Sequence, residues 1–301
     1  MKTQIVPTQY FDAYHEKQRI AIGKHITNLK EKPPDSDTTV KALIESAFFS
    51  SRIDGNPILL DNYLTYHFTG TLPLNKPIIS GMELVFIEAA VASCNIEGNP
   101  TTVEEYLQFL YDRLNSITKA DEIKEIFTGY EYAQNNALTL SAFYKAHEIL
   151  SHSLIYNPAF RGSNRDHEAG VYNEDGLIYK ATSAAEIEAE MKKLFSDISL
   201  LLKSDLSLSE AFYYSSFLHQ ILIKIHPFIL GNGIAARLLE KWFLAQKIGS
   251  VAWQIPSEKL YQNRRKSYYR NIMLGKDYQK IDYGLTLPFL LMLPRALTAK
   301  F

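Results

Sequence analysis

Hydrophobic residues recur at intervals of three and four positions along most of the chain, which is the period of an amphipathic helix. Glycine is scarce inside these segments, and Pro or Gly tends to close them. The pattern therefore predicts a mainly α-helical protein. The expected helices include Leu43–Phe49, Leu84–Val91, Leu140–Leu150, Ile187–Leu202, Phe212–Ile225 and Ile234–Leu244.

One strand pattern interrupts the helices. Two short apolar runs flank the segment 173–176, which ends in the Asp-Gly pair typical of a tight turn. We expect a small β-hairpin on the surface, because two strands in a helical body have no larger sheet to cover their edges. Its strand residues are Val171, Tyr172, Leu177, Ile178, Tyr179 and Lys180.

Composition narrows the class of protein. The chain has 301 residues, a formal net charge of −1 and 46% hydrophobic residues, as in ordinary folded proteins. Balanced charge argues against coating of nucleic acid, which needs an excess of Lys and Arg. No apolar run has the length of a membrane span, and the N-terminus lacks the apolar core of a signal peptide. We expect a cytoplasmic protein with no nucleic-acid or membrane partner.

No metal site is expected from the cysteine and histidine pattern. Cys94 is the single cysteine, so it forms no internal disulfide and no Cys-rich metal centre. His147, His152 and His219 have no carboxylate or cysteine partners at metal-ligand spacing. His219 is interpreted as a packed core histidine.

The first half of the chain contains an internal repeat. Residues 44–57 match residues 87–100, and the match continues to Tyr63-Leu64 against Tyr106-Leu107. Two copies are too few for a solenoid, which needs about three units to bury a continuous core. The simplest interpretation is an old duplication of a helix that ends in a Gly C-cap.

The segment 225–237 has a helix–loop–helix pattern. A helix is expected to end at His226, because Pro227 cannot continue it and restricts the residue before it. After a short loop a new helix begins. Ile234, Leu238 and Trp242 are its expected buried stripe.

The same segment carries candidate chemistry. Gly231, Asn232 and Gly233 lead directly into a helix N-terminus, where free N–H groups and the helix dipole favour an anion. Arg237 lies within the first two turns, and His226 is a candidate base. A base, an anion cradle and a cation so close together are what phosphoryl or nucleotidyl transfer needs.

This segment resembles the signature of the Fic family, His-x-Phe-x-(Asp/Glu)-Gly-Asn-Gly-Arg-x-x-Arg. Residues 156–161 look like the stretch before the family's flap, 171–180 like the flap, and 261–269 like the helix that closes the nucleotide pocket. The resemblance implies a Fic-type helical bundle over residues 138–301, preceded by an N-terminal helical region, residues 1–137. The matching motif residues are His226, Phe228, Gly231, Asn232, Gly233 and Arg237.

What the family implies is AMP transfer from ATP to a Ser, Thr or Tyr hydroxyl of a target protein. By resemblance, His226 is the general base, the loop 231–233 cradles the phosphates and Arg237 holds the γ-phosphate. Tyr268 and Tyr269 lie on the helix that closes the pocket. The flap is expected to pair with an extended target segment by strand addition.

Two motif positions depart from the family. Leu230 stands at the acidic position and Ile234 at the first arginine. Leucine offers no oxygen to Mg²⁺, so use of this ion is weakened. Loss of the arginine removes a charge that could neutralise the phosphates. The alternatives are an enzyme of low activity, transfer of another phosphate-containing group, and a catalytically dead regulator that binds nucleotide or a protein partner.

The second repeat copy resembles the family's inhibitory helix, (Ser/Thr)-x-x-x-Glu-(Gly/Asn). Ser93, Glu97 and Gly98 fit this pattern, which implies that Glu97 pairs with Arg237 and competes with nucleotide. The first copy carries Asp54 at the equivalent position and is interpreted as a relic or a structural cap. The sequence leaves the target protein and a homodimeric assembly open.

Overall fold

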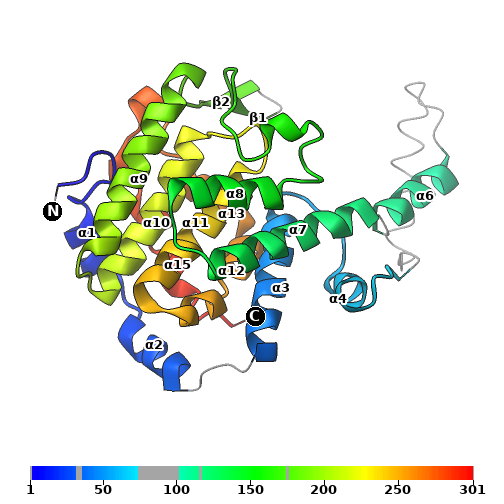
Figure 1. Ribbon diagram of the computed structural model, residues 1–301, viewed down its shortest axis with the longest axis horizontal. Helices are drawn as coiled ribbons and strands as arrows, with labels where there is room; N and C mark the ends of the chain where they lie inside the picture. Colours follow the sequence, from blue (N-terminus) through cyan, green and yellow to red (C-terminus); the bar gives the residue numbers. More distant parts are fainter. Residues whose placement is uncertain (1, 32–35, 74–101, 115–116, 174–175, 301) are drawn as a thin grey trace.

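The computed structural model describes residues 2–31, 36–73, 102–114, 117–173 and 176–300. Within these ranges the chain is mainly helical and has one two-stranded sheet (Figure 1). The main helices are α1 (Phe11–Lys17), α2 (Ile22–Glu31), α3 (Ser36–Ile53), α4 (Leu60–Thr69), α6 (Val103–Leu114), α7 (Ile117–Gln134), α8 (Leu140–Leu150), α9 (Ile187–Lys203), α10 (Leu208–Ile225), α11 (Asn232–Ile248), α12 (Ser257–Asn263), α13 (Arg265–Ile272), α14 (Leu287–Leu290) and α15 (Met292–Arg295).

The helical class expected from the sequence is confirmed. Helices α3, α8, α9, α10 and α11 cover their predicted segments, and α8 has the predicted bounds. The expected helix over 84–91 lies outside the described residues. None of the helices in the described ranges is long and apolar enough to cross a membrane.

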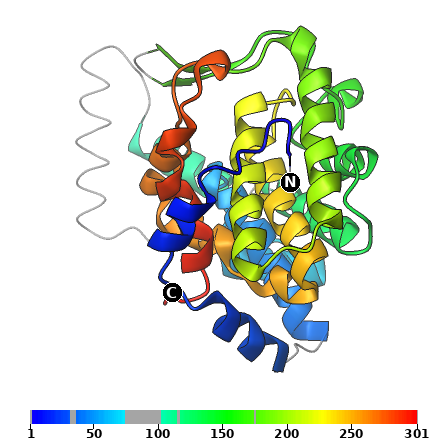
Figure 2. The ribbon, with the colours of Figure 1, turned by 90° about the vertical axis from the view of Figure 1, so that its left-hand side faces the viewer.

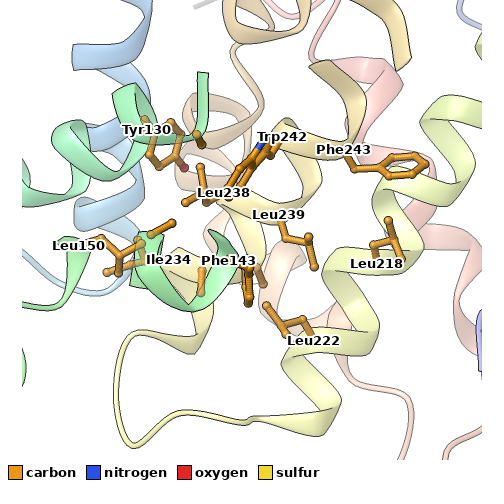
Figure 3. Packing of buried hydrophobic residues seen from close by; sticks show 14 of the residues in the cluster. Tyr130, Phe143, Leu150, Leu218, Leu222, Ile234, Leu238, Leu239, Trp242 and Phe243 are labelled. Atoms are coloured by element: carbon orange, nitrogen blue, oxygen red, sulfur yellow. The ribbon is translucent and has the colours of Figure 1, made fainter. Parts of the chain in front are cut away.

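Helices α10 and α11 form the centre of the molecule and pack along each other. A capping box begins α10, in which Ser207 and Glu210 each bond the other's backbone. Side chains of α7, α8 and α10 converge on those of α11 (Figure 3). The expected stripe of α11 is buried, but so are Arg237, Glu240 and Lys241. The predicted stripe is therefore confirmed, and the helix is buried on its other faces as well, because other helices surround it.

The buried charge of Lys241 on α11 is paired. Lys241 Nζ contacts Glu258 of α12 at 2.7 Å and also donates to Ser46 of α3 at 2.7 Å. Tyr130 of α7 donates to the same Glu258 carboxylate at 3.0 Å. Such partners offset the cost of removing charges from water, which explains how a helix so rich in polar residues occupies the core.

The N-terminal helices are part of the same core. One hydrophobic cluster extends from Val6 to Met292, and α3 contributes Leu43, Ile44 and Ala47 to it. Helix α1 packs beside α10 and α14, so the first helix lies against the C-terminal part of the chain on one side of the bundle (Figure 2). The expected domain boundary at residues 137 and 138 stays a prediction.

The predicted hairpin is present as β1 (Gly170–Asn173) and β2 (Gly176–Lys180). The strands pair antiparallel, with Gly170 opposite Lys180 and an irregularity after Val171. The hairpin lies at the edge of the helical body (Figure 1). The Lys180 N–H donates to Lys276 O at 2.8 Å, which ties the base of β2 to the segment before α14.

Candidate functional site

The loop between α10 and α11 has a fixed, compact conformation. His226 follows the last residue of α10 with a φ of 54°, in the left-handed region that non-glycine residues seldom adopt. The Asn232 side chain accepts from Phe228 N at 2.9 Å and donates to Phe228 O at 2.7 Å. Both ends of this amide are thus used to close the loop, so any anion here would be bound by backbone N–H groups.

Arg165 fixes the backbone at His226. This buried arginine donates through Nε to His226 O at 2.7 Å and through Nη2 to Thr182 O beyond the flap. Its own N–H donates to Pro227 O at 2.8 Å. The sequence analysis did not single out Arg165, because nothing in the local pattern shows that residues 165 and 226 meet.

The His226 imidazole is neutral at neutral pH. Burial, which is the largest cause, and the charges of Arg165 and Lys224 together lower its pKa to about 4, while a backbone contact with Ile223 acts in the opposite direction. These effects outweigh the helix-end dipole, which would favour the charged form. His226 Nδ1 faces Ile223 O at 3.4 Å, which leaves Nε2 free to accept a proton.

His147 holds the glycine end of the loop. Gly162 N–H donates to His147 Nδ1 at 3.0 Å, so Nε2 carries the proton and bonds Leu230 O at 3.0 Å. Its ring stacks on Phe228, with centroids 3.5 Å apart. Gly231 has a φ of 79°, and a Cβ there would lie 3.3 Å from His147 Nε2. His147 is thus a structural support of the motif loop, which the sequence analysis missed.

Phenylalanine at position 147 is expected to lower the free energy of unfolding by about 2 kcal/mol, because the ring can still stack while Gly162 N and Leu230 O lose their partner. Urea denaturation of His147→Phe against wild type measures this. His152→Phe is the matched control, since the His152 side chain is largely exposed. Equal, small effects of both substitutions would contradict the supporting role.

Arg237 is enclosed by polar partners from α3 and α13. Its Nε donates to Ser50 Oγ at 2.8 Å, and its Nη2 donates to Ser50 O at 3.0 Å and to Asp54 Oδ2 at 2.7 Å. Its Nη1 donates to Tyr268 OH at 3.3 Å. Burial opposes the charge, but Asp54, Tyr268 and Tyr130 outweigh burial and raise the pKa of the guanidinium. Arg237 is therefore a buried, fully charged cation.

The Asp54 carboxylate lies at the N-terminus of α11. A Cβ on Gly233 would lie 3.3 Å from Asp54 Oδ1 and 3.2 Å from Arg237 Nη1. The Asp54 carboxylate therefore lies beside the first turn of α11 and binds Arg237 of the same helix. This is the position where the dipole and the free N–H groups of a helix favour a phosphate.

A polar stripe attaches the end of α3 to α11. Ser46, Ser50 and Asp54 follow one another at four-residue spacing, which places them on one helix face. Lys241 bonds the first of them, and Arg237 bonds the other two. The last turn of α3 belongs to the core as well, since Ser50 and Ile53 are buried, whereas the Asp54 side chain beyond it is partly exposed and can move away from Arg237 without loss of core packing.

The interpretation of Asp54 as a relic or cap is wrong, since its carboxylate makes the ion pair with Arg237. The sequence analysis expected this contact from Glu97. Ser93, Glu97 and Gly98 lie outside the described residues. The shorter aspartate reaches the guanidinium because Ser50 Oγ and Ser50 O bring α3 against it.

A small cavity lies beside this ion pair. It measures about 160 Å³ and is bordered by Asp54, Glu122 and Ile234, together with apolar residues of α7 and α8. Small-molecule sites generally measure about 300–1,000 Å³. With Asp54 in place, the space is too small and too acidic for a nucleoside triphosphate.

Residues 137–244 match the family described as Fic/DOC. This segment is a Fic domain. It contains α8 to most of α11, including the hairpin and the loop at His226. No curated protein matches the chain in sequence.

Solved Fic proteins have a similar fold. A Fic family protein from Desulfovibrio desulfuricans aligns with a TM-score of 0.68 at 18% identity, over 99% of this chain and 76% of the other. A Fic-domain signalling protein from Bacteroides thetaiotaomicron aligns with a TM-score of 0.57 at 19% identity, over 96% and 93%. Fic-1 from C. elegans gives 0.55 at 13% identity, over 96% and 71%.

The motif loop of this Fic domain does not fit a carboxylate-held Mg²⁺. Leu230 is 46% exposed at the acidic position and has no oxygen to offer. Within the described ranges, His, Cys, Asp and Glu side chains form no group of three or more that could hold a metal ion. No step proposed below passes through a metal.

The flap and α13 surround the motif from two sides. Tyr179 is buried, and its hydroxyl donates to Lys224 O at 2.7 Å, so it anchors β2 to α10. Leu177 on the same strand is exposed, whereas the Tyr172 side chain is outside the described residues. Tyr268 is buried against Arg237, while Tyr269 is partly exposed and donates to Ile53 O at 3.1 Å.

Proposed function

We propose that the protein is a Fic-type adenylyltransferase that moves AMP from ATP to a Ser, Thr or Tyr hydroxyl of a target protein. The target hydroxyl oxygen attacks the α-phosphorus, the bond between the α-phosphorus and the bridging oxygen breaks, and pyrophosphate leaves. The hydroxyl proton passes to His226 Nε2. The exposed flap would hold the target segment by strand addition.

The observation that carries the proposal is the Asp54 carboxylate on Arg237 beside Gly233. A buried arginine at a helix N-terminus, neutralised by a replaceable carboxylate, is suited to bind the terminal phosphates of ATP. The neutral imidazole of His226 supplies the base on the same loop. The ion pair and the neutral imidazole together support nucleotidyl transfer better than anion binding without chemistry.

We infer further that Asp54 restrains the enzyme. The Asp54 carboxylate and a triphosphate would compete for the same cation and the same helix end. The Asp54 side chain is 38% exposed, so its displacement into water requires no disruption of the core. This proposal gives the restraining role to the first repeat copy.

The test compares wild type, Asp54→Gly and Glu97→Gly. Asp54→Gly is expected to bind ATP at least about tenfold more tightly by calorimetry, because a charge-assisted competitor is removed. It should also label itself or a lysate protein with ATP labelled on the α-phosphate. Glu97→Gly is the matched control from the second repeat copy and should resemble wild type. An effect from Glu97→Gly alone would assign the restraint to the second copy.

A second candidate function follows from Leu230 and Ile234. Because neither the acid nor the first arginine of the motif is present, a regulator that binds nucleotide without transfer is the alternative. Tight ATP binding by Asp54→Gly without any labelling would favour this regulator. No ATP binding by Asp54→Gly would contradict both functions.

A further inference from the structure

A chain of buried hydrogen bonds leads from Arg237 into the core. Tyr268 OH contacts Arg237 Nη1 at 3.3 Å and His219 Nε2 at 3.0 Å. His219 Nδ1 contacts Glu240 Oε2 at 3.0 Å. Tyr261 donates to the same carboxylate at 2.9 and 3.0 Å. All five side chains are buried, and they come from four helices, α10, α11, α12 and α13.

One set of directions satisfies every donor in this chain. A guanidinium only donates, so Tyr268 oxygen accepts from Arg237. The buried tyrosine O–H needs an acceptor, and His219 Nε2 is the partner within reach. With Nε2 as acceptor, His219 carries its proton on Nδ1 and donates it to Glu240. The order is Arg237 to Tyr268 to His219 to Glu240.

The two ends of the chain have opposite charges. Glu240 is fully buried, and its carboxylate is bonded by the side chains of His219 and Tyr261. Arg237 lies at the other end, and the dipoles of Tyr268 and His219 are aligned between the two charges. Such aligned chains strengthen each bond in a low-dielectric interior. Tyr268 therefore holds the guanidinium from the side of the core, and this contact does not depend on α3.

This support gains importance when the Asp54 carboxylate is displaced. Arg237 would then lose its ion pair and keep its contacts with Ser50 on α3 and with Tyr268 OH on α13. Because Ser50 holds Nε and Tyr268 holds Nη1, the nitrogen that Asp54 leaves stays pointed in one direction. Preorganised donors cost no reordering when the charged ligand arrives.

We propose that Tyr268, His219 and Glu240 are positioning residues that hold Arg237 ready for the terminal phosphates of the nucleotide. This inference rests on the proposed function. It predicts selectivity between nucleotides, because AMP lacks the phosphates that Arg237 would bind. A purely structural role of the same residues would affect ATP and AMP equally.

Calorimetry of the Asp54→Gly chain with ATP and with AMP tests the proposal. Addition of Tyr268→Phe should weaken ATP binding about tenfold, the effect of losing one hydrogen bond to a charged group, and leave AMP binding unchanged. His219→Leu should reproduce this loss, whereas His219→Gln, whose amide oxygen can accept from Tyr268, should recover most of it. Tyr213→Phe is the matched control, since this buried tyrosine donates its hydroxyl proton to Pro7 O at 2.9 Å and has no contact with Arg237.

The outcomes separate this inference from the proposed function. If the Asp54→Gly parent does not bind ATP, the proposed function fails before any positioning residue is changed. If the parent binds ATP and Tyr268→Phe weakens ATP and AMP equally, or neither, the positioning role is overturned. Nitrogen-15 NMR of His219 gives a readout without nucleotide: a proton on Nδ1 supports the chain, and a proton on Nε2 overturns it.

Discussion

Alanine at position 226 is expected to lower labelling by the Asp54→Gly chain by about 10²–10⁴-fold, the usual contribution of a general base. Nucleotide affinity should stay the same, because the phosphate-binding groups are the loop backbone and Arg237. Labelling rates and ATP calorimetry on the same preparation measure both quantities. His152→Ala is the control, since this histidine is exposed on another part of the surface.

The pH profile of labelling reports the same base. The pKa of His226 is lowered from its ordinary value to about 4, so the imidazole is neutral and able to accept a proton above that pH. Labelling should therefore fall as the pH decreases through about 4, and it should stay constant through the range near 6.5 where a solvent-exposed histidine titrates. Full activity of His226→Ala, or an acid limb near 6.5, would contradict the assigned role.

Restoring the family's residues at both altered motif positions is expected to raise the rate of labelling. In the Asp54→Gly chain, Leu230→Asp together with Ile234→Arg should raise labelling by about 10⁴-fold, because each electrostatic group contributes about 3 kcal/mol to such transition states. Each single substitution should give about the square root of this gain. The measurement is the initial rate with labelled ATP, with and without Mg²⁺ for the aspartate variant.

The structure accommodates the two substitutions differently. Leu230 is half exposed, so aspartate there replaces an apolar side chain in contact with water. Ile234 is buried and borders the cavity that also contains Asp54 and Glu122. Arginine at 234 has this cavity to enter and the Glu122 carboxylate near it, at some loss of apolar burial. Thermal unfolding of each variant separates loss of the fold from lack of gain.

A folded double variant that labels no faster than its parent would show that these two positions do not limit the reaction. The protein would then be better described as a regulator that binds nucleotide without transfer. A gain that appears only in the double variant would show that the natural chain has lost most of its catalytic power at Leu230 and Ile234.

Local sequence signals predicted most of the described fold. The apolar period located the helices, Pro227 marked the end of α10, and the Asp-Gly pair located the hairpin. Each of these depends on residues within a few positions of one another, which is the range that periodicity and turn chemistry can read. The motif around His226 was visible for the same reason.

Local sequence signals could not show which of the two repeat copies supplies the carboxylate that pairs with Arg237. Ser50 to Asp54 and Ser93 to Glu97 carry nearly the same pattern, and the glutamate looked the better partner for Arg237. The ion pair in the structure is made by Asp54, because Ser46 and Ser50 dock the same face of α3 on Lys241 and Arg237. A contact across 183 positions depends on how helices pack.

By itself, the sequence determined that the chain is mainly helical and that one segment with the Fic motif carries a candidate base, a glycine loop and an arginine. The tertiary structure decided which carboxylate occupies that arginine, which histidine supports the loop, and which one backs Tyr268. Along the chain, His219 is interpreted as a core histidine, and His147 shows only that it lacks partners at metal-ligand spacing. Their roles depend on buried partners that lie far away in sequence, and burial is what makes those hydrogen bonds specific and costly to lose.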